Sequence, residues 1–276
     1  MLMSTQASRY AHRLLNARAH AQQIPPLSSQ EFLSIADSYD IAKNIQAERV
    51  IHGETPIGRK IGFTSRTERT KYGVAEPIHS PLWAPVYDTT VRYAEENRGI
   101  QSLEGAVQPR IEPEIIFKLG ETPAPDATFE SFADCIEWMA HGFEIVVCPY
   151  PEWKFQAADV IAAFGLHGSL IIGEPRKLPP RSRRHLAEIL ANSSVSLSCD
   201  GVLCAAGFGA DLLDSPVNAM WHLHRMLISQ RKFAPLAAGE IISTGAWTDA
   251  YPIEAGQTWA SAFSGVIIPG LTVSFV

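Results

Sequence analysis

Two glutamates, Glu112 and Glu114, lie two positions apart inside the apolar segment "RIEPEIIFKL" of residues 110–119. Side chains alternate between the two faces of a β-strand, so residues i and i+2 point in the same direction. Two carboxylates on one half-buried face repel each other, which predicts a positive group between them. A third carboxylate, Glu144, lies in "FEIVVCPY" (143–150). Three carboxylates without a nearby His-x-His or Cys pair indicate a hard cation, and Mg²⁺ or Mn²⁺ fits best.

The same spacing has a second interpretation, in which Glu112 and Glu114 line an exposed edge of a sheet. Pro113 favours this interpretation, because proline has no N–H to donate to a central ladder. Most glutamates in strands are solvated. The spacing alone therefore leaves the metal site and the exposed edge both open.

Lys60 is the next residue that could do chemistry, in "GRKIGFTS" (58–65) between Gly58 and Gly62. A lysine held near a metal site would have a lowered pKa and could move protons or stabilise an enolate. Taken alone, the segment favours a plainer interpretation, a surface lysine at the end of a strand.

The composition is that of a globular protein with a hydrophobic core. The 276 residues are 46% hydrophobic and 19% charged, with a net charge of −6. No basic stripe points to nucleic acid, and no apolar run reaches the ~18 residues of a membrane helix. The start, "MLMSTQASRY", does not resemble a secretory signal, and the four cysteines show no CxxC spacing. We expect a cytoplasmic protein with reduced thiols and with neither membrane nor nucleic-acid partner.

The first fifty residues are expected to be helical. A first helix is predicted over "ASRYAHRLLNARAHAQQ" (7–23), and Pro25 and Pro26 end it. Its apolar face carries Tyr10, Leu14, Ala17 and Ala21. A second helix is predicted to begin at a capping box formed by Ser28 and Glu31.

The remainder of the chain is predicted to be rich in short strands. The clearest strands are 58–65, 111–117 and 143–150, and a helix is predicted over 127–140. Residues 195–207 predict a hairpin with Asp200-Gly201 at its turn. A further helix is expected after Ser215-Pro216, with Ser as the N-cap and Pro as the first helical residue.

Helices that flank a β-rich centre favour one α+β unit. We predict an N-terminal helical region, 1–55, and a β-rich catalytic region, 56–276, with a soft boundary between them. No internal repeat or low-complexity tract is present.

Six segments in this order resemble the fumarylacetoacetate hydrolase superfamily, and most closely its 2-keto-4-pentenoate hydratase and 4-oxalocrotonate decarboxylase branch. The segments are "GRKIGFTS", "YGVAEPIHSPLW", "RIEPEIIFKLG", "FEIVVCPY", "GFGADLLDSPVNAMWHLHRML" and "LAAGEIISTGAWTDAYPIEAGQTWAS". The similarity covers nearly the whole chain. It implies a mixed β-roll core with an N-terminal helical region, and a homo-oligomer.

The resemblance also implies roles for individual residues. The implied ligands of Mg²⁺ or Mn²⁺ are Glu112, Glu114 and Glu144. Lys60 would lie beside the metal-bound substrate. Ser243 and Thr244 lie in the "STG" loop, where the family contacts the substrate carboxylate.

The chain departs from the pattern of this branch in two places. Many hydratases carry A-D-N-A-S where residues 158–173 read "ADVIAAFGLHGSLIIG". Aligning Asp159 with the family's aspartate leaves apolar residues and glycine at 163–166, where polar groups usually steer water or substrate. His167 is new there, and it either replaces those groups or is a core or turn histidine bonded to backbone. Ser80 stands where the family usually has glycine.

The function that we favour is a divalent-metal-dependent hydratase, which adds water to a 2-hydroxy-2,4-dienoate through a metal-stabilised enolate. Lys60, Asp159 or His167 would move the protons. The alternatives are a 2-oxo acid decarboxylase, a C–C hydrolase of an acylpyruvate and a non-catalytic partner subunit. The hydrolases add a His-Glu pair, for which His52 and Glu54 are a weak equivalent. Three clustered carboxylates argue against a scaffold, because burying them is costly.

Overall fold

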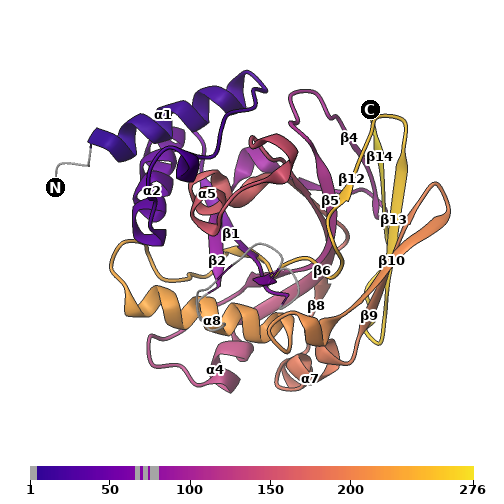
Figure 1. The fold of residues 1–276 in the computed structure, drawn as a ribbon. Coiled ribbons are helices and arrows are strands. Elements are labelled where there is room, and N and C mark those ends of the chain that lie inside the picture. The colour runs from indigo at the N-terminus through magenta and orange to yellow at the C-terminus, as the bar shows by residue number, and fades with distance from the viewer. Residues whose placement is uncertain (1–4, 66–68, 71–73, 75–80) are drawn as a thin grey trace.

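Two β-sheets and the helices around them make up the structure, a computed structural model that describes residues 5–65, 69–70, 74 and 81–276 (Figure 1). The larger sheet is mixed, with the strand order β2-β1-β11-β5-β6-β7-β3, and with β12 and β8 paired to β5 and β6. Its strands are β1 (Pro56–Gly62), β2 (Leu82–Tyr87), β3 (Val91–Tyr93), β5 (Arg110–Leu119), β6 (Ile136–Val146), β7 (His167–Ile172), β8 (Arg176–Lys177), β11 (Ile241–Ser243) and β12 (Tyr251–Pro252).

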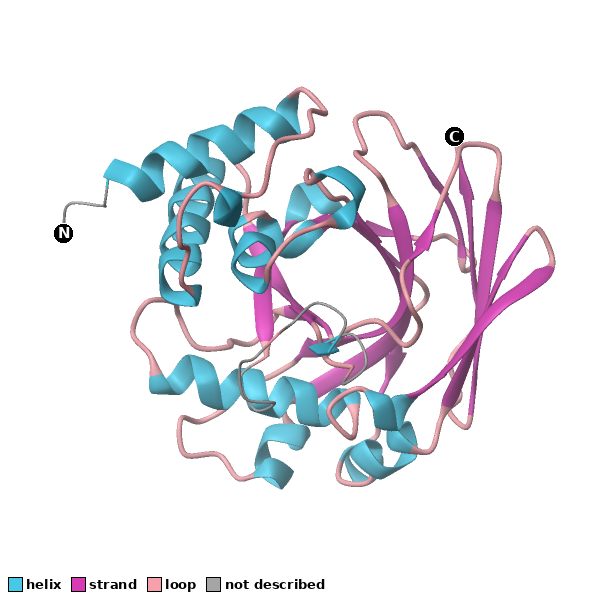
Figure 2. Ribbon diagram, viewed as in Figure 1, coloured by secondary structure: helices cyan, strands magenta, loops and turns pink. Residues whose placement is uncertain are grey.

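The smaller sheet has the order β10-β9-β13-β14-β4. Its strands are β4 (Arg98–Gln101), β9 (Ser194–Cys199), β10 (Val202–Phe208), β13 (Thr258–Ser264) and β14 (Leu271–Phe275). It lies on the opposite side of the larger sheet from the N-terminal helices (Figure 2). The main helices are α1 (Thr5–Ala19), α2 (Ile35–Ile51), α4 (Phe129–Asp134), α5 (Ala157–Ala162), α6 (Pro180–Arg183), α7 (Leu186–Ala191) and α8 (Pro216–Ser229). The curled mixed sheet with N-terminal helices confirms the predicted α+β fold.

Strand β5 divides its side chains between two environments. Ile115 and Phe117 face a hydrophobic core that includes Met220 and Leu223 of α8. Glu112 and Glu114 have the other parity, so they lie on the opposite face of the strand. The alternation of the sequence therefore packs one face of β5 against a helix and turns its carboxylates towards the other side of the sheet.

Pro113 lies at the centre of the larger sheet, so the exposed-edge interpretation is wrong. On one side β5 pairs with β6, and on the other it pairs with β11 and β12. Between the ends of β11 and β12, the carbonyl oxygen of Pro113 accepts a hydrogen bond of 3.0 Å from the backbone N–H of Trp247. Pro113, which has no N–H, therefore lies where the regular hydrogen-bond ladder is already interrupted. No ladder hydrogen bond is lost by having proline at this position.

The N-terminal helices are attached to the β-rich part of the chain through α5. Tyr10 and Leu14 of α1 belong to one core with Ile41 and Ile45 of α2 and with Ile161 of α5. Helix α1 ends at Ala19, so Ala21 was wrongly placed on its face. The predicted division at residue 55 falls between α2 and β1, and whether the two regions are separate structural units stays a prediction.

The second helix begins later than the sequence suggested. Helix α2 starts at Ile35, and its capping box is formed by Ser34 and Asp37. Ser28 and Glu31 were therefore the wrong pair, and residues 27–29 form a short 3₁₀ turn. Ser28 has another partner, described below.

The predicted helix over 127–140 is half right. Residues 129–134 form α4, but β6 begins at Ile136. Pairing of this segment with β5 outweighs its local helical pattern. Two other predictions are confirmed: Asp200 and Gly201 form the turn between β9 and β10, and Ser215 caps α8 with Pro216 as its first residue.

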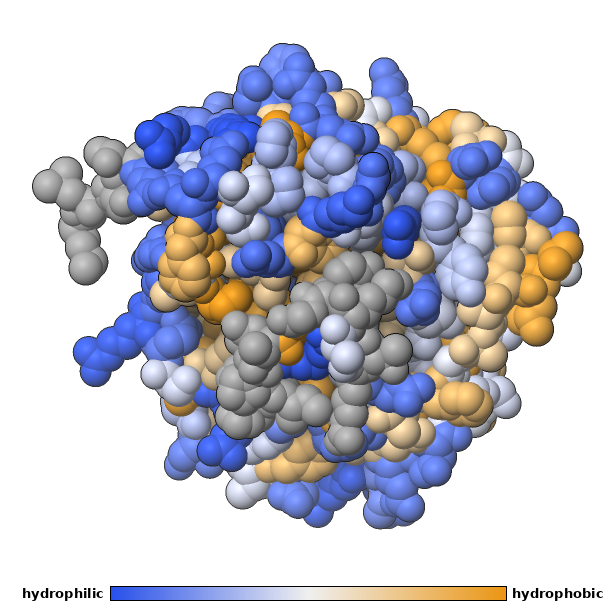
Figure 3. Space-filling model, viewed as in Figure 1, coloured by the Kyte–Doolittle hydropathy of each residue, from blue (hydrophilic) through white to orange (hydrophobic). Residues whose placement is uncertain are grey.

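Apolar side chains gather at the turn end of the β9–β10 hairpin, on the right of the space-filling view (Figure 3). Val202 is 68% exposed and Leu203 is 66% exposed, on a strand at the edge of the smaller sheet. Among the described residues, no helix combines the length and apolar character required to cross a membrane. Ser80 and most of the segment 72–80 lie outside the described residues.

Candidate active site

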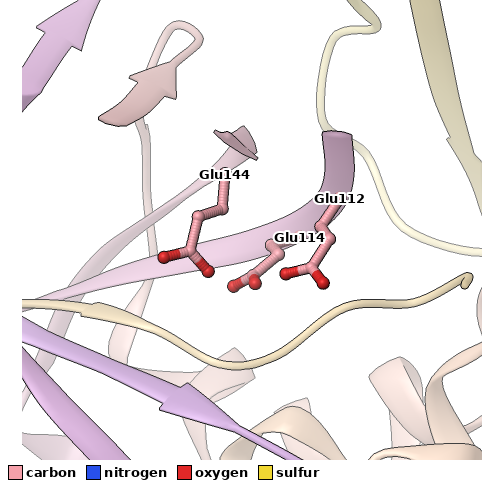
Figure 4. A group of neighbouring side chains, drawn as sticks. All are labelled: Glu112, Glu114 and Glu144. Carbon is pink, nitrogen blue, oxygen red and sulfur yellow. The ribbon is translucent and has the colours of Figure 1, made fainter. Parts of the chain in front are cut away.

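The three predicted carboxylates converge on one point between β5 and β6. Glu112 is directly opposite Glu144 in the register of the two strands, and Glu114 lies on the same face. One oxygen of each carboxylate lies within 4.8 Å of the others, and Figure 4 shows the three side chains pointing together. Glu112 is 7% exposed, and Glu114 and Glu144 are 0% exposed. The spacing argument from the sequence was therefore correct about the shared face.

Glu114 is held at one oxygen only. Its Oε2 accepts hydrogen bonds from the Ser243 hydroxyl and, at 3.0 Å, from the Gly245 backbone N–H. Its Oε1 is buried and has no hydrogen-bond partner in the described part of the chain. Burial, followed by the charges of Glu144 and Glu112, raises the pKa of Glu114 well above its ordinary value. A buried carboxylate with an unsatisfied oxygen is costly unless a cation or proton joins it.

Lys60 is a buried member of this cluster. Its Nζ lies 2.9 Å from Oε2 of Glu144 and donates a 3.0 Å hydrogen bond to the carbonyl oxygen of Gly165. Burial opposes its charge, but Glu144, Glu112 and Glu114 outweigh burial and raise the pKa of Lys60. The surface interpretation is wrong, because Lys60 is 5% exposed. The lowered pKa expected for this lysine beside a metal ion stays a prediction.

His167 contacts the other oxygen of Glu144. Its Nδ1 lies 2.7 Å from Glu144 Oε1, and its Nε2 lies 2.9 Å from Thr90 Oγ1. Burial lowers the pKa of His167 against the opposing effect of Glu144. For Glu144 itself, burial favours the neutral form, but Lys60 and then His167 outweigh it and lower its pKa. Glu144 is thus an ionised carboxylate with the Lys60 ammonium paired to one oxygen and the His167 ring beside the other, although its Oε2 makes no hydrogen bond among the described residues.

Residues 163–166, where the family usually has polar side chains, contribute a backbone carbonyl to the cluster. Phe164, Gly165 and Leu166 have φ values of 60°, 61° and 60°, a left-handed turn that non-glycine residues rarely adopt. This turn presents the Gly165 carbonyl to Lys60. A Cβ atom on Gly165 would lie 2.8 Å from the Cβ of Ala84. Residue types carry no signal for a carbonyl contact, so sequence analysis missed it.

Asp159 lies in a structural position at the start of α5. Its Oδ1 accepts a 2.9 Å bond from the Ser28 N–H, and its Oδ2 accepts a 2.6 Å bond from the Ser28 hydroxyl and a 2.9 Å bond from the Gln156 N–H. It therefore ties the turn at 27–29 to α5. In the described residues, no hydrogen bond or ion pair links Asp159 to the carboxylate cluster.

Ser243 and Thr244 both have buried side chains with partners. The Ser243 hydroxyl donates to Glu114, as described above. The Thr244 hydroxyl donates a 2.8 Å bond to the carbonyl oxygen of Ile115. Both hydroxyls therefore hold β11 and the following loop against β5.

A cavity opens beside the cluster. Lys60, Glu112 and Arg110 line it together with apolar walls formed by residues that include Phe63, Trp83, Trp153, Phe155, Val160 and Leu166. The guanidinium carbon of Arg110 lies 4.0 Å from the centroid of the Trp153 ring. Asp249 also lines the cavity. Such a cavity, largely apolar with a few charged groups, suits a small organic acid.

Comparison with known proteins gives the family. No family model matches the chain. The chain is 30% identical over 209 residues to a 2-hydroxypent-2,4-dienoate hydratase of Pseudomonas putida, which covers 75% of the chain and 89% of the relative. It is 29% identical over 249 residues to a 4-oxalocrotonate decarboxylase of a Pseudomonas species, covering 90% and 91%.

Solved structures have the same fold. A 4-oxalocrotonate decarboxylase from Pseudomonas putida G7, complexed with magnesium and adipate, superposes with a TM-score of 0.86 at 22% identity over 100% of this chain and 99% of that one. A fumarylpyruvate hydrolase from Pseudomonas aeruginosa, in complex with Mn²⁺ and pyruvate, has a TM-score of 0.57 at 15% identity, covering 79% and 88%.

The fold and the named relatives together define a family of metabolic enzymes. The chain belongs to the fumarylacetoacetate hydrolase superfamily, in its branch of 2-keto-4-pentenoate hydratases and 4-oxalocrotonate decarboxylases. Both activities of that branch are lyase activities, and the resemblance noted in the sequence is confirmed.

Proposed function

We propose that the chain is a divalent-metal-dependent hydratase that adds water to a 2-hydroxy-2,4-dienoate. The observation that carries the proposal is the buried convergence of Glu112, Glu114 and Glu144 beside a cavity. Several relatives at 28–30% identity are named hydratases of such dienoates or of 2-keto-4-pentenoate.

The donor set supports Mg²⁺ or Mn²⁺ as the metal. Three carboxylates and an unsatisfied Glu114 Oε1 offer hard oxygen ligands, which these cations prefer. A bound divalent cation would supply Lewis-acid stabilisation of the negative charge that develops on a 2-oxo acid. Related structures contain magnesium or Mn²⁺, which supports the same choice.

The chain's own residues have distinct proposed roles. Lys60 lines the cavity and would hold a proton at Nζ beside the substrate. His167 would fix the orientation of Glu144, and Ser243 that of Glu114. Asp159 would act by positioning the turn at 27–29, rather than as a proton carrier as first expected. Thr244 would support the loop on which a substrate carboxylate could bind.

The second candidate is a 2-oxo acid decarboxylase. The decarboxylase relative matches 90% of the chain, and the solved decarboxylase spans all of it with a TM-score of 0.86. A C–C hydrolase has less support, because the weak His-Glu equivalent does not form a pair. His52 is exposed with Nδ1 2.7 Å from the Glu48 carbonyl oxygen, and Glu54 is paired with Arg49. If the assay detects no reaction, the interpretation as a non-catalytic partner subunit is favoured.

Proton NMR of 2-hydroxypenta-2,4-dienoate in D₂O, with the protein and Mg²⁺ and with EDTA as the control, tests the reaction. We expect metal-dependent formation of 4-hydroxy-2-oxopentanoate. Deuterium exchange without hydration would favour decarboxylation or C–C cleavage instead. No change at all would contradict the hydratase.

Glu114→Gln tests the metal site in the same assay. We expect it to abolish turnover and to weaken Mn²⁺ binding in calorimetry, while the fold stays intact. Glu137→Gln is the matched control, because Glu137 is a strand glutamate that is 35% exposed and paired with Lys118. Full activity of Glu114→Gln with Mg²⁺ present would rule out the metal assignment.

A homo-oligomer and a cytoplasmic location complete the proposal. The exposed Val202 and Leu203 on edge strand β10 support association of copies, because such edges are usually covered. Free thiols at all four cysteines support a reducing compartment. Sedimentation of the wild type and of Leu203→Lys would test the first point, with a smaller assembly expected for the variant.

A further inference from the structure

A β-bulge at the start of β7 puts His167 on the face of the sheet that carries the carboxylates. Glu144 is opposite Leu170 and Val146 is opposite His167, so one residue separates the two positions on β6 but two separate them on β7. The extra residue is Gly168, and an extra residue reverses the alternation of side chains beyond it. His167 therefore shares a face with Val146 and Glu144, whereas a regular ladder would turn it to the other face.

Arg18, near the end of α1, bonds the backbone of this bulge. Its Nη1 donates a 2.6 Å hydrogen bond to the carbonyl oxygen of His167, and its Nη2 donates a 3.2 Å bond to that of Gly168. Its guanidinium carbon lies 4.8 Å from the centroid of the Phe164 ring. The side chain thus contacts both the bulge and the left-handed turn that precedes it. A planar guanidinium with donors in a rigid fork suits two neighbouring carbonyl groups.

The charge of Arg18 is not neutralised by a direct ion pair with a described residue. Burial, and then the charge of Arg49, lower the pKa of Arg18 to about 10, so the guanidinium is protonated at neutral pH. Glu54 raises this pKa by a smaller effect, and both of its oxygens are bonded to Arg49. A partly buried cation that bonds only carbonyl groups gains little from charge pairing. The contribution of Arg18 therefore lies in the geometry of the backbone that it bonds.

The left-handed turn needs such support. Phe164 and Leu166 have φ values of 60°, a strained conformation for non-glycine residues that persists only where surrounding contacts fix it. Arg49 of α2 is a second contact of the turn, with its guanidinium carbon 5.7 Å from the centroid of the Phe164 ring. Both N-terminal helices thus bring a cation to the turn. Of the two cations, Arg18 is the one that bonds the backbone beside it.

We infer that Arg18 is a positioning residue of the candidate active site. By holding the bulge and the turn, it keeps the Gly165 carbonyl oxygen 3.0 Å from Lys60 Nζ and His167 Nδ1 2.7 Å from Glu144 Oε1. It acts through these groups and is not among the residues that line the cavity. This inference rests on the proposed function, because it takes Lys60 and Glu144 to belong to a metal-dependent lyase site. It gives the N-terminal helical region a part in that site.

Hydrogen exchange in EDTA tests the structural part without metal or substrate. Two amides report on the turn: Leu166 N–H donates to the Ala163 carbonyl oxygen, and Val147 N–H donates to the Leu166 carbonyl oxygen, each at 2.8 Å. In Arg18→Ala we expect both amides to exchange about tenfold faster or more, because two charge-assisted hydrogen bonds are lost. The amides of α2 and β9 should keep the wild-type rates. Guanidinium ion at millimolar concentration should restore the protection, and methylammonium, which lacks the planar fork, should not.

Turnover of 2-hydroxypenta-2,4-dienoate with Mg²⁺ tests the functional part. We expect kcat of Arg18→Ala to fall about tenfold to a hundredfold, as misplaced reacting groups produce, while KM changes little. Guanidinium ion should raise kcat of this variant again, whereas it should leave the wild type unchanged.

Arg13→Ala is the matched control. Arg13 lies on the same helix and donates a 3.0 Å hydrogen bond to the side chain of Gln30 instead of to β7. This variant loses the same charge and should keep the wild-type exchange rates and kcat. Arg18→Lys should keep part of both, since it retains the charge without the fork.

The outcomes separate this inference from the proposed function. If the two amides exchange at the wild-type rate in Arg18→Ala, or if the increase extends equally to α2 and β9, Arg18 does not position the turn and the inference is wrong. Faster exchange with an unchanged kcat would also overturn it. If the wild type does not convert the dienoate, the proposed function is wrong, and hydrogen exchange still decides whether Arg18 holds the turn.

Discussion

The Nζ of Lys60 lies 2.9 Å from Oε2 of Glu144, and both side chains are buried. The other oxygen of Glu144 lies 2.7 Å from Nδ1 of His167, so a basic side chain lies beside each oxygen of this carboxylate. Glu114, in contrast, is joined to no basic side chain among the described residues, and its Oε1 also lacks a hydrogen-bond partner. The cluster therefore combines a firmly ionised anchor with a carboxylate whose ionisation requires a further positive charge.

Lys60→Met is expected to destabilise the fold and to abolish turnover. It leaves Glu144 as a buried charge without its ammonium partner, which typically costs about 3–5 kcal/mol of the free energy of unfolding. Urea denaturation in EDTA measures this loss. Lys118→Met is the control, because Lys118 and Glu137 form a partly exposed pair that should contribute less than about 1 kcal/mol.

The same pair permits a double-mutant cycle. Lys60→Met combined with Glu144→Gln removes both charges, so the double variant should be destabilised by less than the sum of the single variants. Strict additivity, or a Lys60→Met variant as stable as the Lys118→Met control, would contradict a direct ion pair.

Ser243→Ala is expected to weaken metal binding rather than to act on the substrate. The Ser243 hydroxyl donates to Oε2 of Glu114 and fixes that carboxylate. Loss of a group that orients a metal ligand usually costs about 10–100-fold in affinity. Calorimetry with Mn²⁺ and no substrate measures the effect, and Ser196→Ala in the smaller sheet serves as the control. Unchanged Mn²⁺ affinity with a raised KM would instead favour the direct substrate contact that the sequence suggested.

Gly165→Ala is expected to reduce turnover at least tenfold. A Cβ there would lie 2.8 Å from Ala84 Cβ and 3.2 Å from Lys60 Cδ, so the turn or the lysine must move. Gly53→Ala separates this contact from backbone strain. Gly53 also has a positive φ, of 92°, but a Cβ there meets nothing within 4 Å. Both variants should lose about 1 kcal/mol of stability from the left-handed backbone. Gly53→Ala should keep its activity, and equal turnover in the two variants would contradict the role of the turn.

The sequence predicted the elements in which residue type determines local geometry. The E-x-E alternation placed Glu112 and Glu114 on one face, and Asp200-Gly201 predicted the hairpin turn. It could not predict the strand that begins at Ile136, because pairing with β5 is a long-range contact. The Gly165 carbonyl carries no residue-type signal. The sequence analysis did not name Arg110 as a residue of the cavity, although its position two residues before Glu112 places it on the same face of the strand.

His141 makes stability depend on pH from the face of β6 opposite to that of Glu144. It lies between the rings of Phe143 and Phe263, with Nδ1 3.3 Å from the Pro269 carbonyl oxygen and Nε2 3.0 Å from the Ser261 hydroxyl. A carbonyl can only accept, so Nδ1 carries the proton and Nε2 accepts from Ser261. Burial lowers the pKa of His141 to about 3.

The sign of the effect follows from linkage. Below the ordinary histidine pKa, the unfolded chain binds a proton at His141 that the folded chain does not bind. The free energy of unfolding is therefore at its highest above about pH 6.5 and falls as the pH decreases towards 3. We expect the wild type to lose about 2 kcal/mol between pH 7 and pH 5 through this residue. His141→Asn should lower stability at pH 7 but flatten that dependence in urea denaturation. His20→Asn, at an exposed histidine, should keep the wild-type slope. If His141→Asn kept the wild-type slope of stability against pH, a group other than His141 would cause the pH dependence, because this variant has lost only the His141 imidazole.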